Sequence, residues 1–387
     1  MTGTWLLVIV VAAALAFDFT NGFHDTANSM AAPIATGALK PKTAVAISAV
    51  LNVIGALISV KVATTIAKGM VDTASVTLSV LLAALAGAMI WNLLTWYLGL
   101  PSSSSHALIG GLLGATLAAS GTGAIKWAGF VKKVAVPAVG AVLIAGLVAA
   151  LATYITYRLV HSRKEHAPVT RGYRYGQIAS ASLMSLAHGT NDAQKTMGII
   201  TLALVANGDL PAKGFDVPTW VIVACALTMG AGTYVGGWRI IRTLGERVTP
   251  LEAPQGFAAQ VVASTAILAS SFNGYALSTT HVASGAIMGA GAGRRLASVR
   301  WSLVGRMASA WAITLPASAG VAALGVLIDR AVTGGYVGAI VLTALLIAVC
   351  LVIWRISRKD VVGAKDVGRL PTAAARPVVL SKVKVAA

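Results

Sequence analysis

Residues 21–31 read NGFHDTANSMA, and residues 187–199 read AHGTNDAQKTMGI. Each stretch places a polar, glycine-containing motif with a central aspartate inside an apolar segment. A second pair of motifs follows in the same order, PSSSSHALIGG at 101–111 and LSTTHVASGAIMG at 277–289. The first pair is offset by 167 residues and the second by 175, so the chain is predicted to contain two copies of one fold.

The composition excludes a soluble domain. Of 387 residues, 57% are apolar and only 11% are charged, and the mean hydropathy is +0.81. Soluble domains carry about 25% charged residues, so this chain lacks the polar surface to cover one. The net charge of +18 would indicate nucleic acid in a soluble protein, but in a membrane protein it indicates basic cytoplasmic loops. We therefore expect a lipid bilayer as partner and no nucleic acid.

Crossing the ~30 Å hydrocarbon layer takes roughly 20 apolar residues. Seven continuous stretches of that kind lie at residues 43–62, 77–99, 133–157, 217–238, 256–276, 302–328 and 335–354. Four more are apolar but interrupted by polar residues, at 5–39, 105–120, 177–206 and 279–293. The pattern predicts an all-α polytopic membrane protein with about 10–12 transmembrane segments.

Basic loops predict the orientation. With the N-terminus outside, the inner loops hold 14 Lys and Arg and the outer loops hold 7. We therefore expect a multi-pass protein of the cell membrane, with the N-terminus outside and the C-terminal tail in the cytoplasm. Five crossings then separate the two aspartate motifs, an odd number, so the second repeat lies upside down relative to the first. Inverted repeats are typical of secondary transporters.

This inverted-repeat topology divides the chain into four parts. They are a first transmembrane repeat at 1–157, a basic cytoplasmic linker at 158–176, a second inverted repeat plus an extra helix at 177–355, and a basic cytoplasmic tail at 356–387. Cys225 and Cys350 both lie inside apolar runs, where neither a disulfide framework nor a zinc site is expected.

Charged residues inside the apolar segments are few. Asp18, Asp25 and Asp192 are the acidic ones and Lys195 is the basic one. Each charge opposes insertion by about 2.5–3.5 kcal/mol, so these side chains are expected to face a polar interior. Two alternatives stay open: Asp192 and Lys195 could form a pair that only holds helices together, and Asp18 could share the face of Asp25 or cap a helix.

The segment at 5–39 is too long for one straight crossing, because 35 helical residues span about 52 Å. We expect a break within residues 18–28, with two half-helices meeting near the bilayer midplane, and a corresponding break at residues 188–191. The N-termini of broken helices favour anions.

The hydroxyl-rich motifs have the sequence pattern of helix N-termini, with a capping hydroxyl before an apolar run. Two such N-termini related by symmetry would surround a tetrahedral oxyanion with N–H and O–H donors. Taken singly, each motif could instead serve capping or helix-to-helix hydrogen bonding. His106 and His281 follow these motifs and could orient the loops or relay protons.

The four quoted motifs resemble the duplicated signatures of the inorganic phosphate transporter (PiT) family, and the resemblance spans residues 5–355. It implies an all-helical secondary transporter, not an enzyme, that imports inorganic phosphate through a midplane site by alternating access. It also implies symport with a coupling cation, H⁺ or Na⁺, without a cofactor or a resident metal.

Carried over by position, three groups of residues are expected at the site. The substrate-binding group is Asp25, Asn28, Ser104, Ser105, Asp192, Lys195, Thr279 and Thr280. The coupling or proton-carrying candidates are Asp25, Asp192, His24 and His188. The supporting residues are Asn21, Asn191, His106 and His281.

Two departures from the family pattern favour H⁺, or a neutral metal phosphate complex, over Na⁺. Many Na⁺-coupled members resemble N-D-x-x-N in both copies, whereas here His24 replaces the first Asn and Lys195 ends the second copy. Asn52 and Gln260 also stand where some members are expected to carry Glu. A lysine ammonium at a cation site would repel Na⁺, although Lys195 could instead contact phosphate.

Four other interpretations stay open. They are Na⁺-coupled phosphate symport, a permease for sulfate or another oxyanion, an anion channel or receptor on the same fold, and an intramembrane enzyme. Phosphate can donate a hydrogen bond to an aspartate and sulfate cannot, so the two aspartates favour phosphate. The sequence also leaves a homodimer open.

Overall fold

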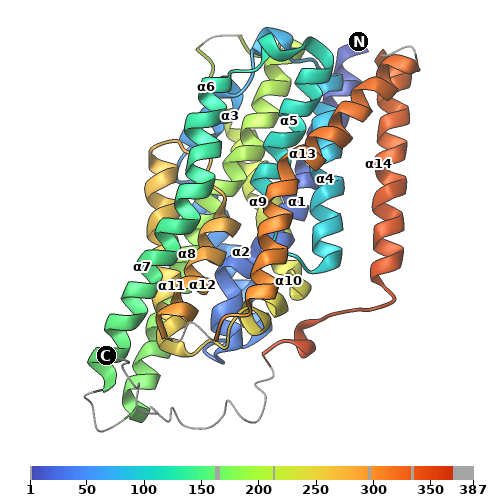
Figure 1. The fold of residues 1–387 in the computed structure, drawn as a ribbon. Coiled ribbons are helices and arrows are strands. Elements are labelled where there is room, and N and C mark those ends of the chain that lie inside the picture. Colours follow the sequence, from blue (N-terminus) through green and yellow to red (C-terminus); the bar gives the residue numbers. More distant parts are fainter. Residues whose placement is uncertain (1, 162–165, 212–213, 295–297, 333–334, 369–387) are drawn as a thin grey trace.

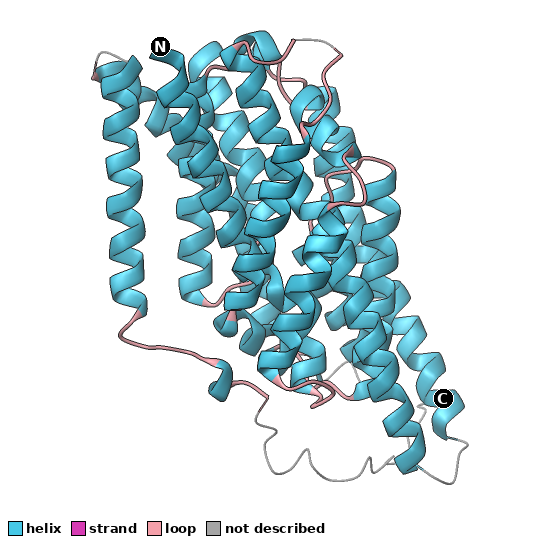
Figure 2. Ribbon diagram, turned by 180° about the vertical axis from the view of Figure 1, so that it is seen from behind, coloured by secondary structure: helices cyan, strands magenta, loops and turns pink. Residues whose placement is uncertain are grey.

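The computed structural model describes residues 2–161, 166–211, 214–294, 298–332 and 335–368, and these form helices joined by loops, with no β-sheet (Figure 2). An all-helical fold was predicted and is confirmed. The elements are α1 (Thr2–Ala35), α2 (Pro41–Ala56), α3 (Lys61–Gly69), η1 (Thr73–Ser75), α4 (Leu78–Leu98), α5 (Ser104–Ser120), η2 (Thr122–Ala124), α6 (Trp127–Phe130), η3 (Val131–Ala135), α7 (Val136–His161), α8 (His166–Asn207), α9 (Thr219–Val235), α10 (Trp238–Arg242), η4 (Thr243–Arg247), α11 (Ala253–Phe272), α12 (Thr279–Arg294), α13 (Trp301–Ala331), α14 (Gly335–Ser357) and η6 (Ala364–Asp366).

Each of the eleven apolar segments coincides with a helix or a bent helix pair. Within the described residues, five helices are long and apolar enough to cross a membrane, or seven if each bent pair counts as one span. The number is below eleven partly because α5 and α12 have 17 and 16 residues. At 1.5 Å per residue these two reach about 24–26 Å, short of the ~30 Å layer.

The predicted helix breaks are wrong. α1 and α8 run without interruption through residues 18–28 and 188–191. Gly22 lies against the backbone of α9, and Gly189 lies against the backbone of α2, so closely that a methyl group at either position would overlap with a carbonyl oxygen. These glycines serve close helix packing rather than a break. The bends lie between α2 and α3, at 66°, and between α9 and the helix of residues 238–247, at 59°.

Two hairpins give the bundle its inverted symmetry. α4 leads into α5 and α11 leads into α12, and α5 and α12 run from the interior toward opposite ends of the molecule (Figure 1). Each short helix packs on the other repeat, α5 on α13 and α12 on α7. Gly114 lies against Ala319, and Gly289 lies against Gly146, so backbones meet closely at both crossings.

The outer surface is apolar. On α7 the side chains of Leu143, Ile144, Leu147 and Leu151 are all more than half exposed. α14 stands at the edge of the bundle, where it packs on α4 and α13 (Figure 1). Because polar side chains gather inside and large apolar ones lie outside, the exterior suits contact with lipid.

The predicted linker and tail are only partly described. Residues 166–176 belong to α8, while residues 162–165 of the linker and residues 369–387 of the tail lie outside the described residues. After α14 the chain returns to the bundle, where the Gly368 N–H donates to Glu246 Oε1 at 2.7 Å and Val367 is buried. The four-part division of the chain stays a prediction.

Candidate functional site

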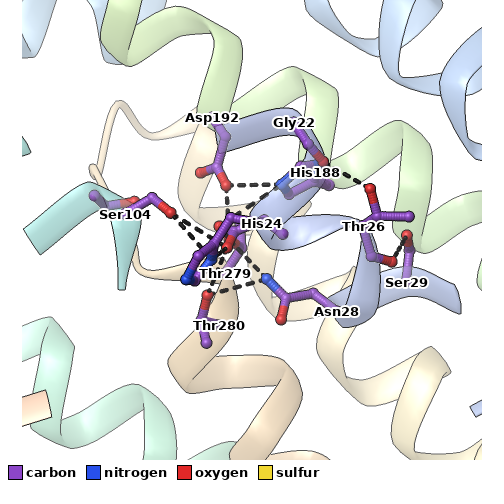
Figure 3. Close-up of polar contacts among 12 residues, drawn as sticks. Gly22, His24, Thr26, Asn28, Ser29, Ser104, His188, Asp192, Thr279 and Thr280 are labelled. Atoms are coloured by element: carbon purple, nitrogen blue, oxygen red, sulfur yellow. Dashed lines mark hydrogen bonds and ion pairs between the residues drawn. The ribbon is translucent and has the colours of Figure 1, made fainter. Parts of the chain in front are cut away.

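The hydroxyl motifs begin two helices inside the bundle, as predicted. Ser103 Oγ accepts from the His106 N–H at 3.1 Å at the start of α5, and Ser278 Oγ accepts from the His281 N–H at 3.3 Å at the start of α12. Side chains of α5 and α12 meet there with those of α1 and α8 (Figure 3). Four helices from two repeats thus build one buried polar centre.

Asp25 of α1 is surrounded by donors. Its Oδ1 lies 2.6 Å from His24 Nδ1 and accepts from Ser104 Oγ and Thr280 Oγ1, both at 3.3 Å. Its Oδ2 accepts from Thr279 Oγ1 at 3.4 Å. The carboxylate is 1% exposed, so protein donors replace the water that an ionised group would otherwise require.

Asp192 of α8 occupies the equivalent place in the second repeat. Its Oδ2 accepts from Thr279 Oγ1 at 2.7 Å and lies 2.9 Å from His188 Nε2. The same His188 nitrogen lies 3.9 Å from Asp25 Oδ2. Because a hydroxyl has one hydrogen, Thr279 serves one aspartate at a time, and it connects the two carboxylates.

Lys195 pairs with Asp192 Oδ1. Its ammonium also donates to Ser105 Oγ at 2.5 Å and to the Leu277 carbonyl oxygen at 3.0 Å. An ammonium has three N–H donors, so all three are used inside the protein. Lys195 therefore neutralises its own aspartate, and the side chain is buried with it.

The protonation of His188 follows from its neighbours. Thr233 Oγ1 donates to the Met229 carbonyl at 2.9 Å, so it accepts from Asn52 Nδ2 at 2.8 Å. This orients the Asn52 amide so that its Oδ1 accepts from His188 Nδ1–H at 3.0 Å. The opposite nitrogen then faces Asp192, and this contact requires a second proton, on the imidazole or on the carboxyl. His188 and Asp192 therefore share one proton in addition to the Nδ1–H.

Asn28 occupies the position in the first repeat that Lys195 occupies in the second, 167 residues earlier. Its Nδ2 donates to Thr280 Oγ1 at 3.1 Å, as Lys195 donates to Ser105. All the predicted substrate-binding and coupling residues are thus brought together.

The four supporting residues lie farther out. Asn191 Nδ2 donates to Ser271 Oγ at 2.8 Å and so fastens α8 to the hairpin. The His106 and His281 rings pack edge-on, with centroids 4.7 Å apart. Asn21 is buried. Among the described residues, none of these four side chains bonds to either central aspartate.

Three contributors were missed by sequence reasoning, Asn92 and Thr95 on α4 and Ser102 before α5. Ser104 Oγ lies 2.9 Å from Asn92 Oδ1 and 3.3 Å from Asp25 Oδ1, so its one hydrogen serves Asn92 or Asp25 at a time. Thr95 and Ser102 lie 2.7 Å apart and approach His24 Nε2 at 3.4 and 3.5 Å. The available signal was the lone Asn in the apolar run at 78–98.

Asp25, His188 and Asp192 also offer ligand atoms that lie within 4.8 Å of one another, a group able to hold a metal ion. The motifs themselves led us to expect no resident metal. The ammonium of Lys195 already occupies the other oxygen of Asp192, which adds a positive charge beside this group.

Comparison with known proteins decides the family. The profile of the phosphate transporter family matches the chain twice, at residues 21–172 and 161–322. The chain belongs to the phosphate transporter family. The two matches correspond to the two repeats, and membership of a family of transporters confirms that the chain is not an enzyme.

Relatives in the phosphate transporter family span most of the chain. A protein of Mycobacterium bovis named "Probable low-affinity inorganic phosphate transporter" is 55% identical over 355 residues, 92% of this chain and 85% of the relative. A protein of Bacillus subtilis with the same name is 43% identical, over 82% of this chain and 96% of the relative. A solved structure, "The sodium-dependent phosphate transporter", has the same fold, with a TM-score of 0.75, 21% identity and coverage of 85% of this chain and all of that one.

Proposed function

We propose that this protein imports inorganic phosphate across the cell membrane by symport with H⁺. The observation that carries the proposal is the meeting of two buried carboxylates with hydroxyl and amide donors at the N-termini of α5 and α12. Helix N-termini and hydroxyl groups bind tetrahedral oxyanions, and the carboxylates accept the hydrogen of a protonated phosphate.

Coupling follows from competition for the same donors. Ser104, Thr279 and Thr280 donate to Asp25 or Asp192 in this structure. Phosphate competes with these carboxylates for the hydroxyls, and its negative charge is better tolerated when a proton neutralises a buried carboxyl of the protein. Proton binding and phosphate binding therefore favour each other, which is the requirement for symport.

Alternating access uses the two repeats. α5 belongs to the first repeat but packs on α13, and α12 belongs to the second but packs on α7. Rocking of one repeat against the other would open the site first to the outside and then to the cytoplasm, around fixed ligands.

H⁺ is favoured by Lys195, whose ammonium faces the group that would otherwise bind a metal cation. A second candidate, Na⁺ coupling, is supported by the geometry of Asp25, His188 and Asp192 and by the sodium dependence of the structural relative. The two candidates make opposite predictions for one experiment.

The test is uptake of labelled phosphate by purified full-length protein in liposomes. An inward pH gradient and an inward Na⁺ gradient are imposed separately, with and without excess sulfate. We expect accumulation with the pH gradient alone and no competition by sulfate. Accumulation with Na⁺ alone would contradict H⁺ coupling, and displacement by sulfate would contradict phosphate specificity. Downhill equilibration without accumulation would indicate a channel.

A further inference from the structure

Asp18 is a buried carboxyl outside the site described above. It lies on α1 seven residues before Asp25, about 10 Å along the helix axis and on nearly the same face. It is 0% exposed, and its Oδ1 accepts from Thr196 Oγ1 of α8 at 2.9 Å. Within the described part of the chain, its Oδ2 has no hydrogen-bond partner and no basic side chain pairs with it.

The surroundings of Asp18 offer little compensation for a negative charge. On α8 the Asp192 carboxylate opposes such a charge and His188 partly offsets it, and the Cys225 thiol lies on α9. The neighbouring α4 contains no Asp, Glu, Lys, Arg or His. A buried carboxylate with one hydroxyl donor and a second carboxylate nearby is costly, so the neutral acid is the favoured form in this conformation.

In the second repeat, the position equivalent to Asp18 carries a hydroxyl group instead of a carboxyl group. The residue 167 positions after Asp18 is Ser185, and the residue 167 positions after Ser29 is Thr196. Ser185 and Ser29 both bond to Ser48 Oγ, at 2.9 and 3.1 Å, so hydroxyls alone join the helices there. Helix packing therefore does not explain why the first repeat carries a carboxyl.

We propose that Asp18 binds the proton that is co-transported with phosphate. This inference rests on the proposed H⁺ symport and assigns it to a group outside the phosphate-binding ligands. Hydronium in the water on the side of the α1 N-terminus transfers a proton to the ionised carboxylate, so that one O–H bond of hydronium breaks, one carboxyl O–H bond forms and water is left. The carboxyl O–H bond breaks when the site opens to the opposite side and the proton returns to water. In between, the neutral acid permits Asp18 to be enclosed between α1 and α8.

Asp18→Asn separates proton coupling from phosphate binding. The amide has nearly the shape of the neutral acid but cannot exchange a proton. We expect the variant in proteoliposomes to lose pH-gradient-driven accumulation entirely while it still exchanges labelled for unlabelled phosphate at equal concentrations on both sides. Ser185→Ala is the matched control at the equivalent position, and it should keep both activities.

The outcomes distinguish this inference from the proposed function. A wild-type protein that ignores the pH gradient contradicts H⁺ symport itself. A wild-type response that persists in Asp18→Asn contradicts only the role of Asp18. Loss of exchange together with accumulation in a folded, phosphate-binding variant also contradicts it, because Asp18 would then serve the conformational change.

Asp18→Glu covers the case in which Asp18→Asn does not fold. A glutamate keeps a titratable group at this place but alters its distance to Thr196. We expect gradient-driven accumulation with a shifted pH profile, whereas an unchanged profile would overturn the proposal.

Discussion

The two aspartate motifs occupy equivalent places and differ at one decisive position. In the first repeat Asn28 follows Asp25 by three residues, and in the second Lys195 follows Asp192 by three residues. Asp25 is held by His24 and by neutral hydroxyls, whereas Asp192 carries its own ammonium. The two repeats thus each supply one carboxylate, and only the carboxylate of the second repeat is paired with a buried ammonium.

The largest effect is expected from replacing either central aspartate, Asp25 or Asp192, by asparagine. Asp25→Asn should reduce phosphate uptake to the level of empty liposomes. The protein should stay folded and inserted, because the hydrogen-bond partners of Asp25 are neutral hydroxyl groups and an imidazole that can be neutral. Asp192→Asn should also abolish uptake, but it leaves Lys195 buried without a counter-charge, which costs about 3–5 kcal/mol. Thermal unfolding in detergent would distinguish the two variants.

Equal thermal stability of the Asp192→Asn and Asp25→Asn variants would contradict this difference between the two motifs. The double variant Asp192→Asn with Lys195→Met serves as a control, because it removes both members of the pair and should recover most of the lost stability. Wild-type uptake by either single variant would contradict the roles of the aspartates.

The next effect concerns the cation. Lys195→Asn gives the second motif the amide of the first and removes the positive charge beside Asp25, His188 and Asp192. We expect phosphate uptake to become stimulated by Na⁺ and less responsive to the pH gradient. The measurement is the ratio of Na⁺-driven to pH-driven uptake. An unchanged ratio would mean that Lys195 does not select the coupling ion.

A smaller effect is expected at His24. His24→Asn keeps a neutral donor next to Asp25 but removes an imidazole that can take up a proton. The substitution removes the 2.6 Å contact of the imidazole with Asp25 Oδ1, and because a hydrogen bond to a charged group contributes about 1.5–3 kcal/mol, uptake should fall at least about tenfold. The pH profile of uptake should also flatten. His24→Gln is a second neutral variant and should behave alike, whereas a profile identical to that of the wild type would exclude His24 from coupling.

The smallest effect tests the symmetry of the scaffold. Gly22→Ala and Gly189→Ala each place a methyl group against the backbone of a crossing helix, α9 or α2. We expect each to destabilise the protein by about 1–3 kcal/mol, and by similar amounts, in thermal unfolding. Gly140→Ala, where no atom lies within 4 Å of the added methyl, should have no such effect.

The sequence predicted the helices and the two capped N-termini because these depend on local patterns. Apolar stretches and the caps at Ser103 and Ser278 are determined by residues that lie close together in the sequence. The charge argument predicted that Asp25, Asp192 and Lys195 face a polar interior, because a charge inside an apolar segment is costly. The other predicted site residues came from the resemblance to the family.

The breaks in α1 and α8 were predicted wrongly because a glycine has two uses. It weakens a helix, and it also lets a neighbouring helix approach. Gly22 and Gly189 serve the second use, and their partners lie on α9 and α2, far away in sequence. The contribution of Asn92 was missed for the same reason, because only the fold brings α4 to Ser104.

The exchange of α5 and α12 between the repeats has an evolutionary consequence. Each short helix packs on the preceding helix of its own repeat and also on the other repeat, α5 on α4 and α13, and α12 on α11 and α7. An ancestral protein with a single repeat would therefore have needed a second copy, inserted in the opposite direction, to complete its structure. Two copies inserted in the same direction would have lacked the contacts of α5 with α13 and of α12 with α7.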